Sequence, residues 1–88
     1  MVNIENNRTK QTIQTFINIV NNQLHGTSSP EVKETYKRLC NQGYNDEETR
    51  KLIASVLEAE ATLVLKHREP FDQTRYVARL RHLPRVLA

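Results

Sequence analysis

The residues best suited to chemistry in this chain are a glutamate and a histidine on one candidate helix. Glu60 follows Ile53 and Leu57 at helical spacing, on a face that should be buried. His67 lies seven positions beyond Glu60, and positions seven apart share a helical face. One hypothesis is therefore a small metal-binding or catalytic helical protein centred on Glu60 and His67.

A structural ion pair is the simpler interpretation of Glu60. A metal site needs three or four converging ligands, and the sequence has no E-x-x-H or H-x-x-x-H spacing and no second cysteine. A buried carboxylate is normally paired with a cation. We therefore predict that Glu60 pairs with Arg75 or Arg79, and that the protein uses no metal and no cofactor.

Cys40 is the only cysteine, and it lies beside Leu39 on an apolar stripe. A cysteine nucleophile requires a neighbouring base and a third group that orients this base, and the sequence identifies neither. We predict a buried, unreactive thiol. Because the chain also lacks paired carboxylates and a Gly-rich phosphate loop, we expect no enzymatic activity.

The basic residues near the C-terminal end form the candidate partner-binding surface. Arg75, Arg79 and His82 recur at helical spacing, so they should face outward together, and Arg81 and Arg85 add charge beside them. We expect a small non-catalytic accessory or adaptor protein that binds another protein through this face. The alternative is a weak nucleic-acid-binding protein using the same face, although no aromatic stacking platform accompanies the charges.

Length and composition indicate a single small domain. The chain has 88 residues, 38% of them hydrophobic, and a net charge of +3. Residues 66–88 carry six basic and two acidic groups, so all of the excess positive charge lies there. No apolar run approaches the roughly 18 residues of a membrane span. The single cysteine and the polar N-terminal segment favour a cytoplasmic location without membrane association.

The apolar residues recur every three or four positions and nowhere alternate as in a strand. This pattern predicts an all-α four-helix bundle with short loops. The expected helices cover residues 9–25, 30–42, 46–67 and 73–83. Residues 1–8 are expected to form a flexible N-terminus, and residues 9–88 a single helical domain.

Capping signals start the third and fourth helices. Asn45 can accept a hydrogen bond from the backbone of Glu48, whose side chain can reach back, as in a capping box. Asp72 is the expected N-cap of the fourth helix. Phe71 precedes this cap and Tyr76 occupies the fourth helical position, which is the arrangement of a hydrophobic staple.

Glycines end the first two helices, and a serine–proline pair starts the second. Gly26 follows His25, whose side chain is expected to cap the last carbonyl groups. Gly43 suits the turn after the second helix because it adopts positive φ without steric cost. Ser29 is the expected cap before Pro30 at the first helical position.

The long third helix organises the bundle. Its 22 residues would span about 33 Å, which requires more than one partner helix. Apolar residues at its far ends would stay uncovered in a monomer and could be covered in a homodimer. The sequence leaves these two states equally open.

Two segments resemble known helical domains. Residues 39–48, Leu-Cys-Asn-Gln-Gly-Tyr-Asn-Asp-Glu-Glu, resemble the helix–loop–helix start of a ubiquitin-associated-type domain, although the helix here continues past the break that this family shows. Residues 30–84 resemble a family of small bacterial all-helical domains of unknown function. The shared features are Gly-Tyr-x-x-Glu-Glu, a long helix, Pro-Phe-Asp-x-x-Arg-Tyr and a terminal Leu-Pro. This resemblance implies an all-α fold and assigns no activity.

Overall fold

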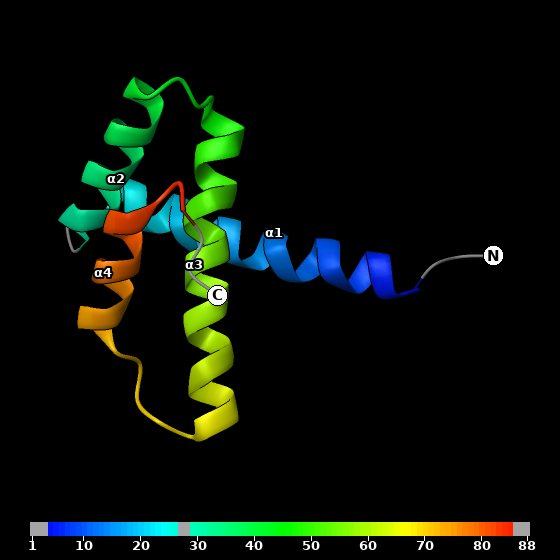
Figure 1. The fold of residues 1–88 in the computed structure, drawn as a ribbon. Helices are drawn as coiled ribbons and strands as arrows, with labels where there is room; N and C mark the ends of the chain where they lie inside the picture. Colours follow the sequence, from blue (N-terminus) through cyan, green and yellow to red (C-terminus); the bar gives the residue numbers. More distant parts are fainter. Residues whose placement is uncertain (1–3, 27–28, 86–88) are drawn as a thin grey trace.

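The computed structural model describes residues 4–26 and 29–85, with side chains from residue 13 onward in these ranges. Four α-helices account for the fold, and these ranges contain no strand. The all-α, four-helix prediction is therefore confirmed (Figure 1). The helices are α1 (Ile4–His25), α2 (Pro30–Asn41), α3 (Asp46–His67) and α4 (Gln73–His82).

The helix bounds agree with the sequence pattern except at the start of α1. This helix begins at Ile4, five residues before the predicted start, so residues 4–8 continue the helix that the pattern placed from residue 9. Asn and Thr are weak helix formers but not breakers, and no glycine or proline interrupts the segment. Helices α2 and α4 each end one residue earlier than predicted, and α3 has the predicted bounds.

The connection between α2 and α3 shows the predicted turn and cap. Gly43 has a φ of 104°, and the backbone N–H of Tyr44 donates to the carbonyl of Leu39 over 3.2 Å, as in a Schellman motif. The capping box is present. The Asn45 side chain accepts from the Glu48 backbone at 2.8 Å, and the Glu48 side chain accepts from the Asn45 backbone at 3.0 Å. Local sequence thus determines the angle at which the chain enters α3.

The start of α4 also has the predicted geometry. The Asp72 side chain accepts a hydrogen bond from the backbone N–H of Arg75 at 3.0 Å. The rings of Phe71 and Tyr76 meet edge to face with centroids 5.5 Å apart, which confirms the hydrophobic staple. At α2, by contrast, the Ser29 side chain makes no capping hydrogen bond. Only the Ser29 backbone carbonyl accepts hydrogen bonds from the first turn, from the N–H groups of Val32 and Lys33.

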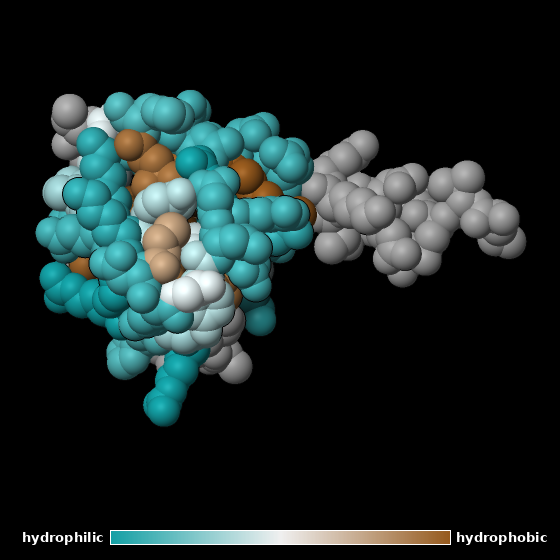
Figure 2. Space-filling view, turned by 90° about the horizontal axis from the view of Figure 1, so that it is seen from above, coloured by the Kyte–Doolittle hydropathy of each residue, from teal (hydrophilic) through white to brown (hydrophobic). Residues whose placement is uncertain are grey.

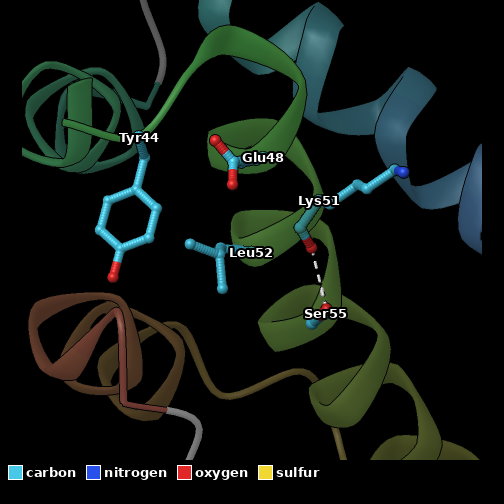
Figure 3. A pocket seen from close by; sticks show the side chains of 5 residues that line it. All are labelled: Tyr44, Glu48, Lys51, Leu52 and Ser55. Carbon is cyan, nitrogen blue, oxygen red and sulfur yellow. Dashed lines mark hydrogen bonds between the residues drawn. The ribbon is translucent and has the colours of Figure 1, made fainter.

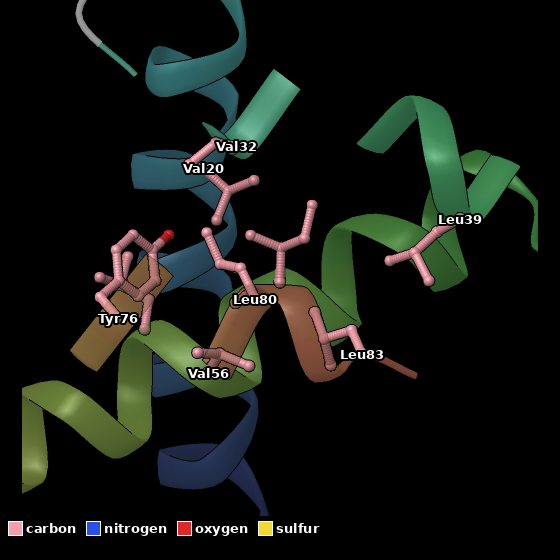
Figure 4. Packing of buried hydrophobic residues seen from close by; sticks show 10 residues of the cluster. Val20, Val32, Leu39, Val56, Tyr76, Leu80 and Leu83 are labelled. Atoms are coloured by element: carbon pink, nitrogen blue, oxygen red, sulfur yellow. The ribbon is translucent and has the colours of Figure 1, made fainter. Parts of the chain in front are cut away.

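Helix α3 lies at the centre of the arrangement. Figure 1 shows α2 and α4 on one side of α3, while α1 crosses α3 steeply and its N-terminal part extends away from the other helices. Figure 4 shows side chains from all four helices meeting in one core, with Tyr76 as its aromatic member. The buried hydrophobic residues are Val20, Val32, Leu39, Ile53, Ala54, Val56, Leu57, Tyr76, Leu80 and Leu83.

The two ends of α3 differ in burial. Ile53 and Val56 are buried between α1, α2 and α4, whereas Leu63 and Val64 are only half-buried and Leu65 is 81% exposed. The other helices therefore do not cover the C-terminal end of α3. Within the described ranges, no helix combines the length and apolar character needed to cross a lipid bilayer.

Candidate functional site

Glu60 of α3 lies at the centre of a buried ion-pair cluster. Its side chain is fully buried, and two arginines of α4, one helical turn apart, reach it. Arg75 Nε lies 2.7 Å from Glu60 Oε2, and Arg79 Nε lies 3.0 Å from Glu60 Oε1. The sequence paired Glu60 with one of the two arginines, and in the structure it contacts both. We name Glu60, Arg75 and Arg79 the Glu60 cluster, which joins α3 to α4.

The two contacts in the Glu60 cluster differ in kind. Arg75 donates a hydrogen bond to Glu60, and this bond raises the pKa of the Arg75 guanidinium above its ordinary value. Arg79 lies within ion-pair distance, but its N–H is not aligned for a hydrogen bond, so Glu60 Oε1 accepts none within the described residues. The Arg79 contact is therefore electrostatic, in a place where solvent screening is reduced.

This cluster changes the expected partner-binding surface. Arg75 and Arg79 were predicted to face outward with His82, but their side chains are only 34% and 21% exposed and point toward Glu60. The reason is that their spacing also matches one buried carboxylate on the neighbouring helix. Arg75 and Arg79 are therefore engaged by Glu60 and are not free to bind a partner.

The remaining basic residues, Arg81, His82 and Arg85, form what we name the basic end of α4. All three are exposed, and none forms a side-chain hydrogen bond or ion pair within residues 13–26 and 29–85. Within the described part of the chain, no carboxylate offsets the charges of Arg81 and Arg85.

A third helix positions this basic end. Arg38 of α2 donates hydrogen bonds to the carbonyls of Leu83 at 2.6 Å and Leu80 at 2.9 Å. Both carbonyls lie at the C-terminal end of α4, where the helix dipole favours a cation. The Leu80 carbonyl also accepts from the backbone N–H of Leu83 at 3.2 Å. Arg38 is 42 residues or more from both acceptors. Helix propensity and hydrophobic periodicity carry no information on contacts at that separation, so the sequence did not predict this one.

Tyr76 links α4 to α1. Its ring is buried, and its hydroxyl donates to Gln23 Oε1 over 3.2 Å. Burial raises the pKa of Tyr76 to about 12, because the phenolate would lose its hydration inside the protein. This residue therefore stays neutral at physiological pH and serves as a structural contact between helices.

The other candidates for chemistry do not come together. His67 is exposed in the last turn of α3 and makes no contact with Glu60, whose carboxylate faces the two arginines. No three His, Cys, Asp or Glu side chains of the described part converge on one point. Cys40 is half-buried rather than buried, and its Sγ lies 3.7 Å from Thr49 Oγ1.

A hollow of about 280 Å³ lies beside the start of α3 (Figure 3). Figure 3 shows the Tyr44 ring and the Leu52 side chain facing each other across it. Its polar side chains have local roles: Glu48 belongs to the capping box, Lys51 pairs with Glu47, and Ser55 donates to the carbonyl of Lys51. This hollow offers an apolar surface without a free reactive group.

Comparison of the chain with protein-family models, with curated proteins and with solved structures found no match. The likeness of residues 30–84 to small bacterial helical domains thus stays a prediction. Functional inference for this chain rests on the placement of its own charged side chains.

Proposed function

We propose that this protein is a small non-catalytic accessory or adaptor protein that binds an acidic segment of another protein through the basic end of α4. The observation that carries this proposal is the exposure of Arg81, His82 and Arg85 without any partner in the described residues. Two unpaired arginines with an exposed histidine between them favour a negatively charged surface, because complementary charge accelerates and orients association.

The support for these cations favours recognition over a merely solvated tail. Leu80 and Leu83 are buried in the core, and Arg38 binds the carbonyls of both residues. The backbone that carries the basic end is therefore fixed from two sides. Binding to a segment whose backbone is already fixed costs less conformational entropy than binding that must first order a loose segment.

A protein partner fits this surface better than nucleic acid does. Single-stranded nucleic acid is usually bound by aromatic residues as well as by cations, and the basic end has no Phe, Tyr or Trp. The charges of Arg81 and Arg85 would also neutralise only a few phosphates. An acidic protein segment needs fewer contacts and no stacking surface.

The test is a pull-down from native lysate with a matched control variant. The binding variant is Arg81→Glu/Arg85→Glu. The control, Lys66→Glu/Arg68→Glu, makes the same charge change at exposed positions near the C-terminal end of α3, at the opposite end of α4. We expect wild type and control to recover the same protein after nuclease treatment, and the binding variant to lose it.

Two other outcomes would contradict the proposal. Recovery only without nuclease, and only at low salt, would indicate nucleic-acid binding by the same face, since phosphate contacts weaken steeply with salt. Equal recovery by both variants would show that the partner does not bind the basic end of α4.

A further inference from the structure

A second concentration of positive charge lies on the side of α2 that faces away from α4. It surrounds a hollow of about 360 Å³, where the end of α1 meets α2 and the start of α3. The residues that line this basic pocket are Leu24, His25, Lys33, Tyr36, Lys37 and Arg50. In the view from above, Figure 2 shows small apolar areas framed by hydrophilic side chains over this end of the molecule.

One wall of the basic pocket is fixed by contacts between α2 and α3. The Arg50 guanidinium lies over the Tyr36 ring, 5.4 Å from its centroid, in a cation–π contact. Asp46 accepts from Arg50 Nε at 2.7 Å and from the Tyr36 hydroxyl at 2.5 Å. Arg50 also donates to Asn21 of α1. These contacts orient the Tyr36 ring and Arg50, and Asp46 offsets most of the Arg50 charge.

The other cations of the basic pocket have no such partner. His25, Lys33 and Lys37 form no ion pair and no side-chain hydrogen bond with the described residues. The expected capping of α1 by the His25 side chain is absent, and this side chain lines the pocket instead. Lys33 and Lys37 lie one turn apart on α2, so both ammonium groups face the same opening.

We propose that the basic pocket binds the phosphate monoester of a small organic molecule. Lys33 and Lys37 supply the positive charge for a dianion and His25 a ring N–H donor, while Leu24 and the Tyr36 ring supply apolar surface for the organic part. The volume lies at the lower end of the range for small-molecule sites. A hollow of this size holds one phosphate group with a small substituent, whereas an extended phosphodiester backbone would reach beyond its lining residues.

This site is independent of the surface proposed for protein binding. Helix α2 carries Arg38 toward α4, and it carries Lys33, Tyr36 and Lys37 toward α1 and α3. A ligand in the basic pocket therefore has no direct contact with Arg81 or Arg85, so substitutions at Arg81 and Arg85 serve as controls for substitutions at Lys33 and Lys37.

The experiment is a titration followed by the backbone amide signals in nuclear magnetic resonance spectra of the full chain. The probes are phenyl phosphate, inorganic phosphate and phenol. The variants are Lys33→Gln/Lys37→Gln and, as a control with the same loss of charge, Arg81→Gln/Arg85→Gln. All three proteins should have the same melting temperature, because the four substituted side chains form no ion pair and no side-chain hydrogen bond within the described residues.

We expect phenyl phosphate to shift the signals of His25, Lys33, Tyr36 and Arg50, and to bind about tenfold more tightly than inorganic phosphate because of its apolar ring. Affinity should fall by about tenfold or more in Lys33→Gln/Lys37→Gln and stay unchanged in the control. Absence of shifts up to about 10 mM probe would overturn the proposal. Equal weakening in both variants, or phenol binding as well as phenyl phosphate, would overturn it too.

Discussion

The two faces of α4 carry similar residues and have opposite environments. On the inner face, Arg75 and Arg79 turn toward the buried carboxylate of Glu60, and Tyr76 lies in the core. On the outer face, Arg81 and, just beyond the helix, Arg85 are exposed and bind nothing within the described residues. The inner face therefore holds α4 in place, and the outer face presents charge to solvent.

The difference shows that the spacing of cations along a helix does not determine which of them are available. Arg75 and Arg79 are four residues apart, as are Arg81 and Arg85. What separates the pairs is one acidic residue on a neighbouring helix. Glu60 is fully buried, and burying a carboxylate without cations would cost several kcal/mol, roughly, so two arginines turn inward.

The sharpest way to break this comparison is Glu60→Gln, which removes the charge and keeps the shape. We expect the free energy of unfolding to fall by about 3 kcal/mol, at the lower end for a broken buried pair because both arginines reach solvent in part. Urea denaturation measures this loss. Glu58→Gln on the same helix makes no ion pair and should stay within about 0.5 kcal/mol of wild type. Equal losses would mean that burial of Glu60 is not what matters.

The contact of Arg38 with the end of α4 gives the next largest effect. In Arg38→Met the carbonyls of Leu80 and Leu83 lose a charged donor, and we expect a loss of about 2 kcal/mol. Hydrogen exchange should accelerate at the amides of the last turn of α4 before those of its first turn. Uniform acceleration along α4 would show that Arg38 does not hold the last turn separately.

Tyr76, on the inner face of α4, makes the stability of the protein sensitive to alkaline pH. Its pKa is raised to about 12 in the folded state, so the unfolded chain releases the phenolic proton first as pH rises above about 10. Stability is then fully present below pH 10 and decreases by about 2 kcal/mol toward pH 12. Tyr76→Phe cannot titrate, and its stability should fall less over this range. Thermal unfolding of both proteins from pH 9 to 12 measures the difference.

The smallest effect is expected at the basic end of α4. Arg81→Ala and Arg85→Ala remove exposed side chains without partners in the described residues, so each should change stability by less than about 0.5 kcal/mol. Differential scanning calorimetry at low and moderate salt gives both values. A loss near that of Glu60→Gln for either substitution would contradict the division of α4 into an inner and an outer face.

Much of the fold follows from local sequence. Three local features were predicted: the capping box at Asn45, the positive φ of Gly43 and the staple of Phe71 on Tyr76. Each of them involves residues within six positions of one another. Helical periodicity likewise determined the bounds of α3. These features depend on neighbours in sequence, so they can be derived without knowing how the helices pack.

The candidate sites depend on packing, and the sequence determined them only in part. Burial of Glu60 was foreseeable from its place on an apolar stripe, but its contact with two arginines at once was not. The bonds of Arg38 to α4 and the convergence of His25 with Lys33 depend on which helix faces lie together. Single-sequence periodicity indicates that a face is buried, not which face covers it.

The most direct test of the division of α4 is a pair of double-mutant cycles. Unfolding free energies are measured for Glu60→Gln, Arg79→Met, Arg81→Met and the two double variants that contain Glu60→Gln. The Glu60 cluster predicts a coupling of about 1–2 kcal/mol between Glu60 and Arg79, and less than about 0.5 kcal/mol between Glu60 and Arg81. Equal coupling to both arginines would contradict this account of α4.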